Sequence, residues 1–168
     1  MGLFSLKLES LQQLFVKELR GLYDAENQIT EALPKMIQNA TVGELKAALQ
    51  EHLEVTRQQI TRLDRIFALL QQKPSGETSR GIKGIISEAS DLLSTGAERN
   101  VIDAGIIAAA QKVEHYEIAA YGTVRTYAEL LGNQEVAQLL QQTLAEEKEA
   151  DTTLNDIASN VNVEARAA

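Results

Sequence analysis

Apolar side chains recur at every third or fourth position over four long stretches of the chain, the spacing that places them on one face of an α-helix. The stretches predict helices over residues 5–39, 44–72, 101–131 and 134–160. Pro34 lies inside the first stretch, so a kink or a helix boundary is expected near Leu33. The alternation of β-branched and aromatic residues that signals strands is missing from the sequence. The pattern therefore predicts an all-α protein.

The connections between these helices predict how they are arranged. Residues 40–43 and the pair Gly132-Asn133 make tight turns, which predict two antiparallel hairpins. Residues 74–100 separate the hairpins, and residues 82–93 within them predict a short extra helix. Because a helix of about 30 residues is about 45 Å long, a connection of this length can return along the whole bundle. We therefore expect a ferritin-like four-helix bundle with one long crossover, the alternative being an up-down-up-down bundle with an insertion.

Length and composition narrow the classes of function. The 168 residues, 44% of them apolar and 24% charged, suit one folded domain, which we assign to residues 1–160, with 161–168 as a frayed C-terminal tail. The formal net charge of −8 argues against a nucleic acid partner, because such binding needs basic residues to neutralise phosphates. The lack of cysteine excludes thiolate chemistry and thiolate metal sites. Neither a membrane span nor a secretory signal is found, so we expect no membrane partner and a cytoplasmic location.

Polar side chains interrupt the apolar stripe near the middle of each long helix. Projection at about 100° per residue places Glu18, Thr56 and Gln59 among the inward-facing polar residues, together with six candidates for a polar site. These candidates are Glu26, His52, Glu114, Glu117, Glu147 and Asp151. Buried polar groups in a bundle core need partners, so this recurrence calls for a chemical explanation.

The depth of these residues along the hairpins supports one common site, because residues equidistant from a turn lie side by side. Glu114 and Glu117 lie some four to five helical turns before the connection near Asn133. Glu147 and Asp151 follow that connection by a similar distance, so all four are expected to meet at one level. Glu26 is expected at the middle of the other hairpin, with His52 about one turn nearer its loop.

Several carboxylates that converge in a bundle core cannot all stay ionised without a cation. A divalent or trivalent metal resolves this conflict, and oxygen-rich ligation with one imidazole suits iron or manganese better than zinc. The sequence therefore predicts a metal site with one or two ions per chain. Of residues 146–149, only Glu147 is expected to point inward, and the others form a solvated charged face.

Structural roles compete with ligation at several positions. His52 lies on an apolar face, where a histidine is often a packed core residue. His115 projects away from the core centre, which favours a surface or interface role. Tyr121 follows Glu117 by one turn, where it either donates a hydrogen bond to a ligand or packs in the core. Glu18 has no partner at its level, which favours a salt bridge or a helix-end contact.

Four segments of the sequence carry a resemblance to a known family. They read YDAENQ (23–28), EHLEVT (51–56), AAAQKVEHYE (108–117) and LAEEKEAD (144–151). Together they resemble the YciF/YciE-like family, a group of bacterial ferritin-like proteins linked to stress responses, over residues 5–158. The resemblance implies a homodimer of ferritin-like bundles with a di-metal centre in each, akin to rubrerythrin.

The resemblance also assigns residues to the centre. Carried over residue by residue, it gives ligand positions to Glu26, Glu114, Glu117 and Glu147. Asp151 stands close to where rubrerythrin-like proteins have a histidine. The second helix departs from the family pattern, because its Glu-x-x-His pair would fall near Gln59, where the chain reads QITR. Either His52 substitutes from two turns away, or the second helix supplies weak ligands or none.

Two functions follow from these observations. The first is a metal-binding ferritin-like protein in a stress response, with a small oxidant, peroxide or oxygen, as its reaction partner. The second is a metal-free dimeric protein with a structural or interaction role. A homodimer through the first hairpin is expected, since Leu19, Val55 and Ile66 widen its apolar surface beyond the core stripe.

Overall fold

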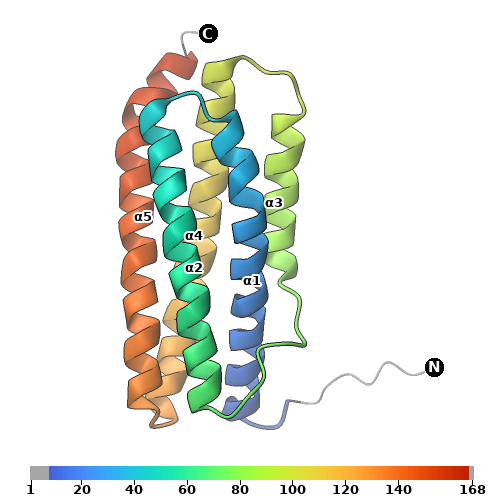
Figure 1. The fold of residues 1–168 in the computed structure, drawn as a ribbon, viewed down its shortest axis with the longest axis vertical. Coiled ribbons are helices and arrows are strands. Elements are labelled where there is room, and N and C mark those ends of the chain that lie inside the picture. The colour runs from blue at the N-terminus through green and yellow to red at the C-terminus, as the bar shows by residue number, and fades with distance from the viewer. Residues whose placement is uncertain (1–7, 167–168) are drawn as a thin grey trace, which may run out of the picture.

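The structure of the protein, a computed structural model, describes residues 8–166 as five α-helices joined by loops (Figure 1). They are α1 (Leu11–Asn39), α2 (Gly43–Leu69), α3 (Arg80–Leu93), α4 (Arg99–Leu130) and α5 (Gln134–Arg166). No strand occurs within this described range, so the predicted all-α class is confirmed. Over the same residues, none of the helices combines the length and the apolar character that crossing a membrane requires.

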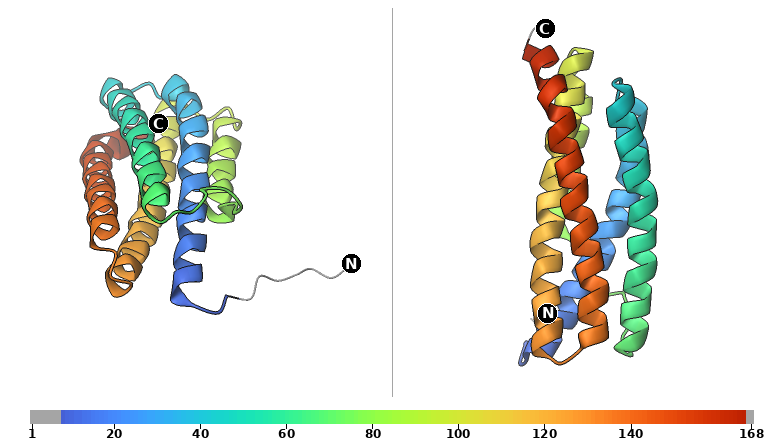
Figure 2. Two further views of the ribbon diagram at one scale, coloured as in Figure 1. Left: turned by 60° about the horizontal axis from the view of Figure 1, so that its bottom comes forward. Right: turned by 90° about the vertical axis from the view of Figure 1, so that its left-hand side faces the viewer.

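The directions of the helices define the topology of the bundle. Helices α1 and α2 form one antiparallel hairpin, and α4 and α5 form the other (Figure 1). Helices α2 and α4 run in the same direction, because α3 and its flanking loops carry the chain from one end of the bundle to the other (Figures 1 and 2). The predicted four-helix bundle with one long crossover is therefore confirmed, and the up-down-up-down alternative is wrong.

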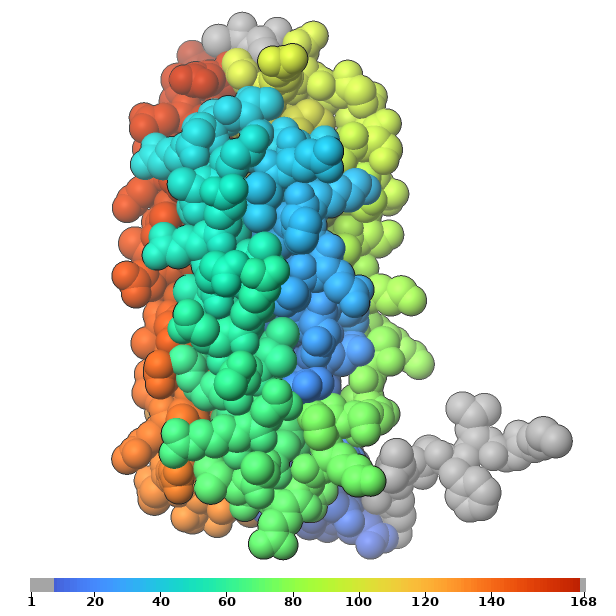
Figure 3. All heavy atoms as spheres, in the orientation of Figure 1, coloured from blue at the N-terminus to red at the C-terminus, as the bar shows by residue number. Residues whose placement is uncertain are grey.

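The crossover helix packs outside the four-helix core, against α1 and α4. In the space-filling view, α1 and α2 lie side by side, with α3 along one flank and α5 along the other (Figure 3). Asp24 of α1 anchors the start of α3, because its Oδ2 accepts a hydrogen bond of 2.8 Å from the backbone N–H of Ser79. The Tyr116 hydroxyl of α4 lies 3.0 Å from Ser79 Oγ, so both neighbouring helices hold this point of the crossover.

The largest differences from the predicted helix boundaries lie at the start of α1 and at the end of α5. Helix α1 begins at Leu11 rather than at residue 5. Ser10 caps it, because its side chain accepts a 3.2 Å hydrogen bond from the N–H of Gln13. Residues 5–7 of the predicted helix lie outside the described range. Helix α1 continues through Pro34 to Asn39, so the proline does not end the helix. Helix α5 continues to Arg166 instead of ending at residue 160, because Val161 is buried in the core and holds a further turn.

The core consists of two apolar clusters, one toward each end of the bundle. The first cluster is built around Phe15, Leu22, Leu63, Phe67, Tyr121 and Leu140. The second is built around Ile29, Leu45, Leu49, Ile106, Ile107 and Leu154. Each long helix contributes to both clusters, and its inward polar residues fall between the two contributions. The bundle thus has a polar layer across its middle.

Two residues assigned to a dimer surface belong to this core. Leu19 and Ile66 are 0% and 1% exposed and pack in the first cluster, so they do not widen an exposed apolar face. Both lie beside the apolar stripe in the projection, and in the structure the first cluster is wide enough to include them. The homodimer itself stays a prediction.

A buried aspartate joins α4 to the connection between α1 and α2. Asp103 is fully buried, and its two carboxylate oxygens accept hydrogen bonds from the backbone N–H of Thr41 at 2.7 Å and from the Thr41 hydroxyl at 2.5 Å. The carboxylate thus accepts hydrogen bonds from two donors of this connection that take no part in the hydrogen-bond pattern of a helix.

We expect Asp103→Ala to lower the free energy of unfolding by about 1–3 kcal/mol, because it leaves the Thr41 donors without partners. Urea denaturation checks this value. Asp156→Ala on the exposed face of α5 serves as the control and should change stability by less than about 0.5 kcal/mol. An effect of Asp103→Ala no larger than that of the control would contradict the anchoring role.

Candidate metal centre

Four potential metal ligands meet in the polar layer. His52 of α2, Glu114 and Glu117 of α4, and Glu147 of α5 each offer one ligand atom, and these atoms all lie within 4.8 Å of one another. The three glutamates are at most 2% exposed, and the side chain of His52 is 11% exposed. His52 Nε2 lies 3.4 Å from Glu114 Oε1. The group therefore combines one imidazole with three buried carboxyl groups from three helices.

Helix geometry explains why these residues meet. Glu114 and Glu117 are three residues apart, so they share one face of α4. Helix α5 packs antiparallel to α4 and brings Glu147 to the same depth, as the distance from the connecting turn predicted. The meeting of these three glutamates at one level is the part of the site that the sequence predicted directly.

Glu26 of α1 forms a second part of the polar layer. It is fully buried, and its Oε1 accepts a hydrogen bond from the Tyr121 hydroxyl. Its other oxygen, Oε2, has no hydrogen-bond partner. Tyr121 therefore has both of the roles considered for it: its hydroxyl donates a hydrogen bond to a candidate ligand, and its ring packs in the core.

Asp151 does not join the group of four ligands. It lies one turn beyond Glu147, and its Oδ1, which has no hydrogen-bond partner, is 3.3 Å from Nε2 of the exposed His115. The hairpin register brings its backbone to the expected region, but its side chain is 18% exposed and faces that histidine. His115 itself has the surface position that its projection predicted. Glu18 also lies at the surface, with its Oε1 3.9 Å from Lys17 Nζ.

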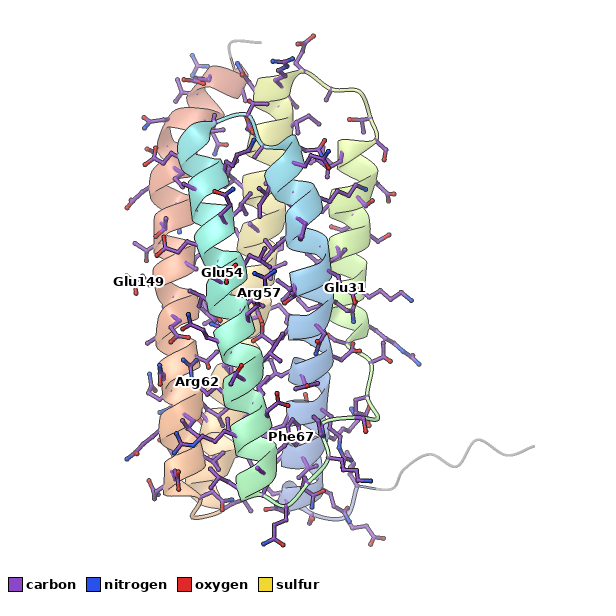
Figure 4. All side chains as sticks on the ribbon, in the orientation of Figure 1. Glu31, Glu54, Arg57, Arg62, Phe67 and Glu149 are labelled. Carbon is purple, nitrogen blue, oxygen red and sulfur yellow. The ribbon has the colours of Figure 1, made fainter. Side chains whose placement is uncertain are left out.

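The second helix contributes donors where the family resemblance implied ligands. Gln59 is fully buried, and its amide donates hydrogen bonds to Glu147 and, at 3.2 Å, to Glu146 Oε2. Arg62, three residues later and labelled in Figure 4, donates to both oxygens of Glu146 at 2.7 and 2.8 Å. Glu146 was expected on a solvated face, but hydrogen bonds from Arg62, Gln59 and Gln142 hold it at the edge of the site. An inward Gln59 was visible in the helical projection, whereas the Arg62–Glu146 pair joins residues distant in sequence and had no such signal.

Most of the ligand atoms in this layer have no hydrogen-bond partner. The unpaired atoms are Glu26 Oε2, His52 Nε2, Glu114 Oε2, both oxygens of Glu117 and Glu147 Oε2. An unsatisfied polar atom in a protein core costs about 1–3 kcal/mol, and more when the group is charged. This concentration of unpaired atoms in a well-packed core is the property that distinguishes the cluster from an ordinary salt-bridge network.

The carboxyl groups of the layer have raised pKa values. Burial, together with the charge of Glu147, raises the pKa of Glu114 to about 10 and that of Glu26 to about 8. Burial raises the pKa of Glu147 to about 7, against hydrogen bonds from Glu114 and Gln59 that lower it. Burial and the charge of Glu26 raise the pKa of Glu117 well above its usual range. Without a cation, the layer therefore holds several protons at neutral pH.

Burial acts in the opposite direction on the histidine. It lowers the pKa of His52 to about 4, so the imidazole is neutral at pH 7. A neutral imidazole can coordinate a metal without first losing a proton. It cannot supply the positive charge that would balance the nearby glutamates.

We expect Tyr121→Phe to lower the free energy of unfolding by about 1–3 kcal/mol, because it removes the hydrogen bond to Glu26 and leaves a buried carboxyl group without its donor. Thermal or urea denaturation in EDTA measures this loss. Tyr127→Phe on the same helix is the matched control, since Tyr127 is only partly buried. Equal stability of both variants and wild type would contradict a positioning role for the Tyr121 hydroxyl.

The sequence of this bundle matches a described family. Residues 10–168 match the model of a family described as a domain of unknown function, DUF892. The chain belongs to the DUF892 family. Protein YciF of Escherichia coli (strain K12) is 39% identical to this DUF892 chain over 165 residues, which cover 95% of the chain and 98% of YciF. The expected resemblance to YciF is thereby confirmed.

Solved structures of relatives share the DUF892 bundle. YcfI from Rhodopseudomonas palustris, whose description proposes a structural role, superposes with a TM-score of 0.88 at 48% identity, over 91% of this chain and 98% of its own. The E. coli stress protein YciF gives a TM-score of 0.89 at 40% identity, over 92% of this chain and 98% of its own. The region matched by the DUF892 model includes every residue of the polar layer.

Proposed function

We propose that this DUF892 protein binds iron or manganese in the middle of its bundle, one or two ions per chain, and acts in a stress response, the role named for its relative YciF. The observation that carries the proposal is the set of buried, unpaired ligand atoms contributed by α1, α2, α4 and α5. A cation would pair with these atoms and remove the need for several buried protons.

The donor set fits the proposed metals. His52, Glu114, Glu117 and Glu147 would form the principal ligand group, and Glu26 would add a carboxylate from the opposite hairpin. One neutral imidazole among several carboxylates is a mixture that suits iron or manganese. We keep Asp151 at the edge of the proposed site, where it would hold His115 rather than an ion.

The other residues of the layer would keep the ligands in place. Tyr121 and Gln59 donate hydrogen bonds to Glu26 and Glu147, and such partners of ligand groups commonly change metal affinity tenfold or more. Arg62 holds Glu146 at the rim of the site. Partial burial acts to raise the pKa of Glu146, but the pairing with Arg62 lowers it below its ordinary value. A bound iron or manganese ion would supply redox chemistry toward a small oxidant, peroxide or oxygen.

Metal analysis tests this proposal. Protein stripped with EDTA is reconstituted anaerobically with Fe²⁺ and, separately, with Mn²⁺, desalted, and assayed for bound metal per chain by mass spectrometry. We expect at least one tightly held ion per chain with one of these metals. Sub-stoichiometric binding of both metals would contradict the proposal.

A second candidate function is a metal-free dimer with a structural or interaction role, which the description of YcfI favours. In that case the raised pKa values let the inward carboxyl groups keep their protons permanently. Both functions include the homodimer, so metal content is the measurement that separates them. Sedimentation tests the dimer itself, and a single species of 18.4 kDa at micromolar concentration would contradict it.

A further inference from the structure

A cavity of about 280 Å³ extends from the polar layer toward the end of the bundle that holds the connection between α1 and α2. In this half, α1 leans away from α4 and α5 (Figure 2). All five helices contribute to its walls. The walls are mainly apolar and include Ile29, Met36, Ile85, Ile106, Val113 and Leu154. The cavity reaches solvent beside the exposed Glu51 and Glu149, so a small molecule can enter it and contact its apolar walls.

The inner end of the cavity is polar. His52 and Glu114 both line it, and both belong to the group of candidate ligands. His52 Nε2 and Glu114 Oε2 have no hydrogen-bond partner, and Glu114 is only 2% exposed. A molecule in the cavity could therefore place one hydroxyl or carbonyl group against these atoms, while its body contacts the apolar walls.

The charges along the cavity restrict the occupant further. Glu51 of α2 and Glu146 and Glu149 of α5 line it, and the lining includes no lysine or arginine. Glu51 and Glu149 are exposed, so they form the outer rim, where Glu149 is labelled in Figure 4. An anionic head group would meet the carboxylates of Glu51 and Glu149 at the rim, and at the inner end it would find only the neutral imidazole of His52 and the protonated carboxyl group of Glu114, with no basic side chain to pair with it. The cavity thus disfavours fatty acids and phosphorylated molecules.

We propose that this cavity binds an uncharged small molecule with an aliphatic or single-ring body and at most one hydroxyl or carbonyl group, which it places against His52 and Glu114. The volume is nearly twice that of an apolar cavity of about 150 Å³ that accepts benzene. Concave, mainly apolar pockets with a few convergent polar atoms are the usual form of small-molecule sites. This proposal goes beyond metal binding and does not require it; the contact with His52 and Glu114 is made in the metal-free protein, because a bound ion would occupy the same atoms.

The experiment uses 1-octanol as the probe and octanoate as its charged counterpart. Titrations of the full chain in EDTA are followed by methyl NMR, so the outcome does not depend on a bound metal. We expect saturable shifts at methyl groups of Ile85, Ile106 and Val113, and none at the exposed Leu130 near the opposite end. Octanoate should bind at least tenfold more weakly than octanol. No saturation by octanol, or equal binding of octanoate, would overturn the proposal.

Variants test whether the probe occupies this cavity. Ala110→Phe fills the space from α4, and Ala48→Leu narrows it from α2, so either folded variant should weaken octanol binding at least tenfold. Ala119→Phe adds the same ring on the exposed face of α4 and should leave binding unchanged. Thermal denaturation confirms that each variant is folded. Octanol binding that survives both cavity variants, or that the control also abolishes, would overturn the assignment of the site.

Discussion

The double variant Glu114→Gln/Glu147→Gln is expected to be at least as stable as wild type in EDTA, yet to gain no stability from Fe²⁺ or Mn²⁺. Glutamine keeps the shape of each side chain and removes a buried acid whose ionised form lacks a cation. The same change removes two of the proposed ligands. Thermal denaturation of both proteins, each in EDTA and with added metal, measures the two effects together.

The size of the metal effect follows from mass action. A ligand at one hundred times its Kd stabilises the folded state by about 2.7 kcal/mol. For a chain of this length, each kcal/mol raises Tm by roughly 2–4 °C, so wild type should gain about 5–10 °C and the variant essentially nothing.

A matched variant separates ligation from a general loss of charge. Glu129→Gln/Glu149→Gln also changes one glutamate on α4 and one on α5, but both positions are exposed. This control should keep the full metal-dependent gain in Tm. Its free energy of unfolding should fall by at most about 0.5 kcal/mol, because the exposed Arg125–Glu129 ion pair is lost. If the inward variant instead melts lower by the same amount in EDTA and in metal, Glu114 and Glu147 form a structural network and are not ligands.

The fold could be predicted from the sequence because its determinants are local. Apolar spacing gave the helices, and the contrast between two tight connections and the long segment 74–100 gave the topology. The helix ends were predicted less well, because they depend on particular contacts. Ser10 caps α1 five residues later than the apolar pattern begins, and Val161 extends α5 through a core contact that periodicity does not specify.

The site could be predicted in part for the same reason. Projection and depth found the residues that meet, because helix geometry sets both for Glu114, Glu117 and Glu147. The roles of individual partners could not be found in this way. Asp151 turns to His115 and Arg62 holds Glu146, and both contacts depend on side chains of helices whose relative rotation the sequence does not state. The apolar cavity beside the site was missed altogether, since side chains of all five helices line it and the sequence does not specify how these helices are spaced.

Between pH 6.5 and 8, the metal-free protein is expected to lose at least about 3 kcal/mol of stability as the pH rises, from Glu26 and Glu114, and Glu117 adds to this loss because its pKa is also raised well above its usual range. In the unfolded chain, the glutamates have a pKa near their ordinary value of 4.5 and are ionised over this whole range. In the folded chain, Glu26 and Glu114 have pKa values of about 8 and about 10 and keep their protons. The folded state therefore binds more protons, and each retained proton lowers stability by about 1.4 kcal/mol per pH unit. Urea denaturation in EDTA at several pH values measures the slope.

The histidine does not disturb this range. The folded pKa of His52, about 4, lies below its ordinary value of 6.5, so its contribution rises with pH between those two values and is complete at pH 6.5. Saturating metal should abolish the decline, because ligation requires ionised carboxylates and becomes stronger as they lose protons. The Glu114→Gln/Glu147→Gln variant in EDTA should show a shallower slope than wild type, because the proton of Glu114 is gone while Glu26 and Glu117 remain. A stability of the metal-free wild type that stays level or increases from pH 6.5 to 8 would mean that these carboxyl groups are ionised in the folded chain, and the electrostatic argument for a cation would then fail.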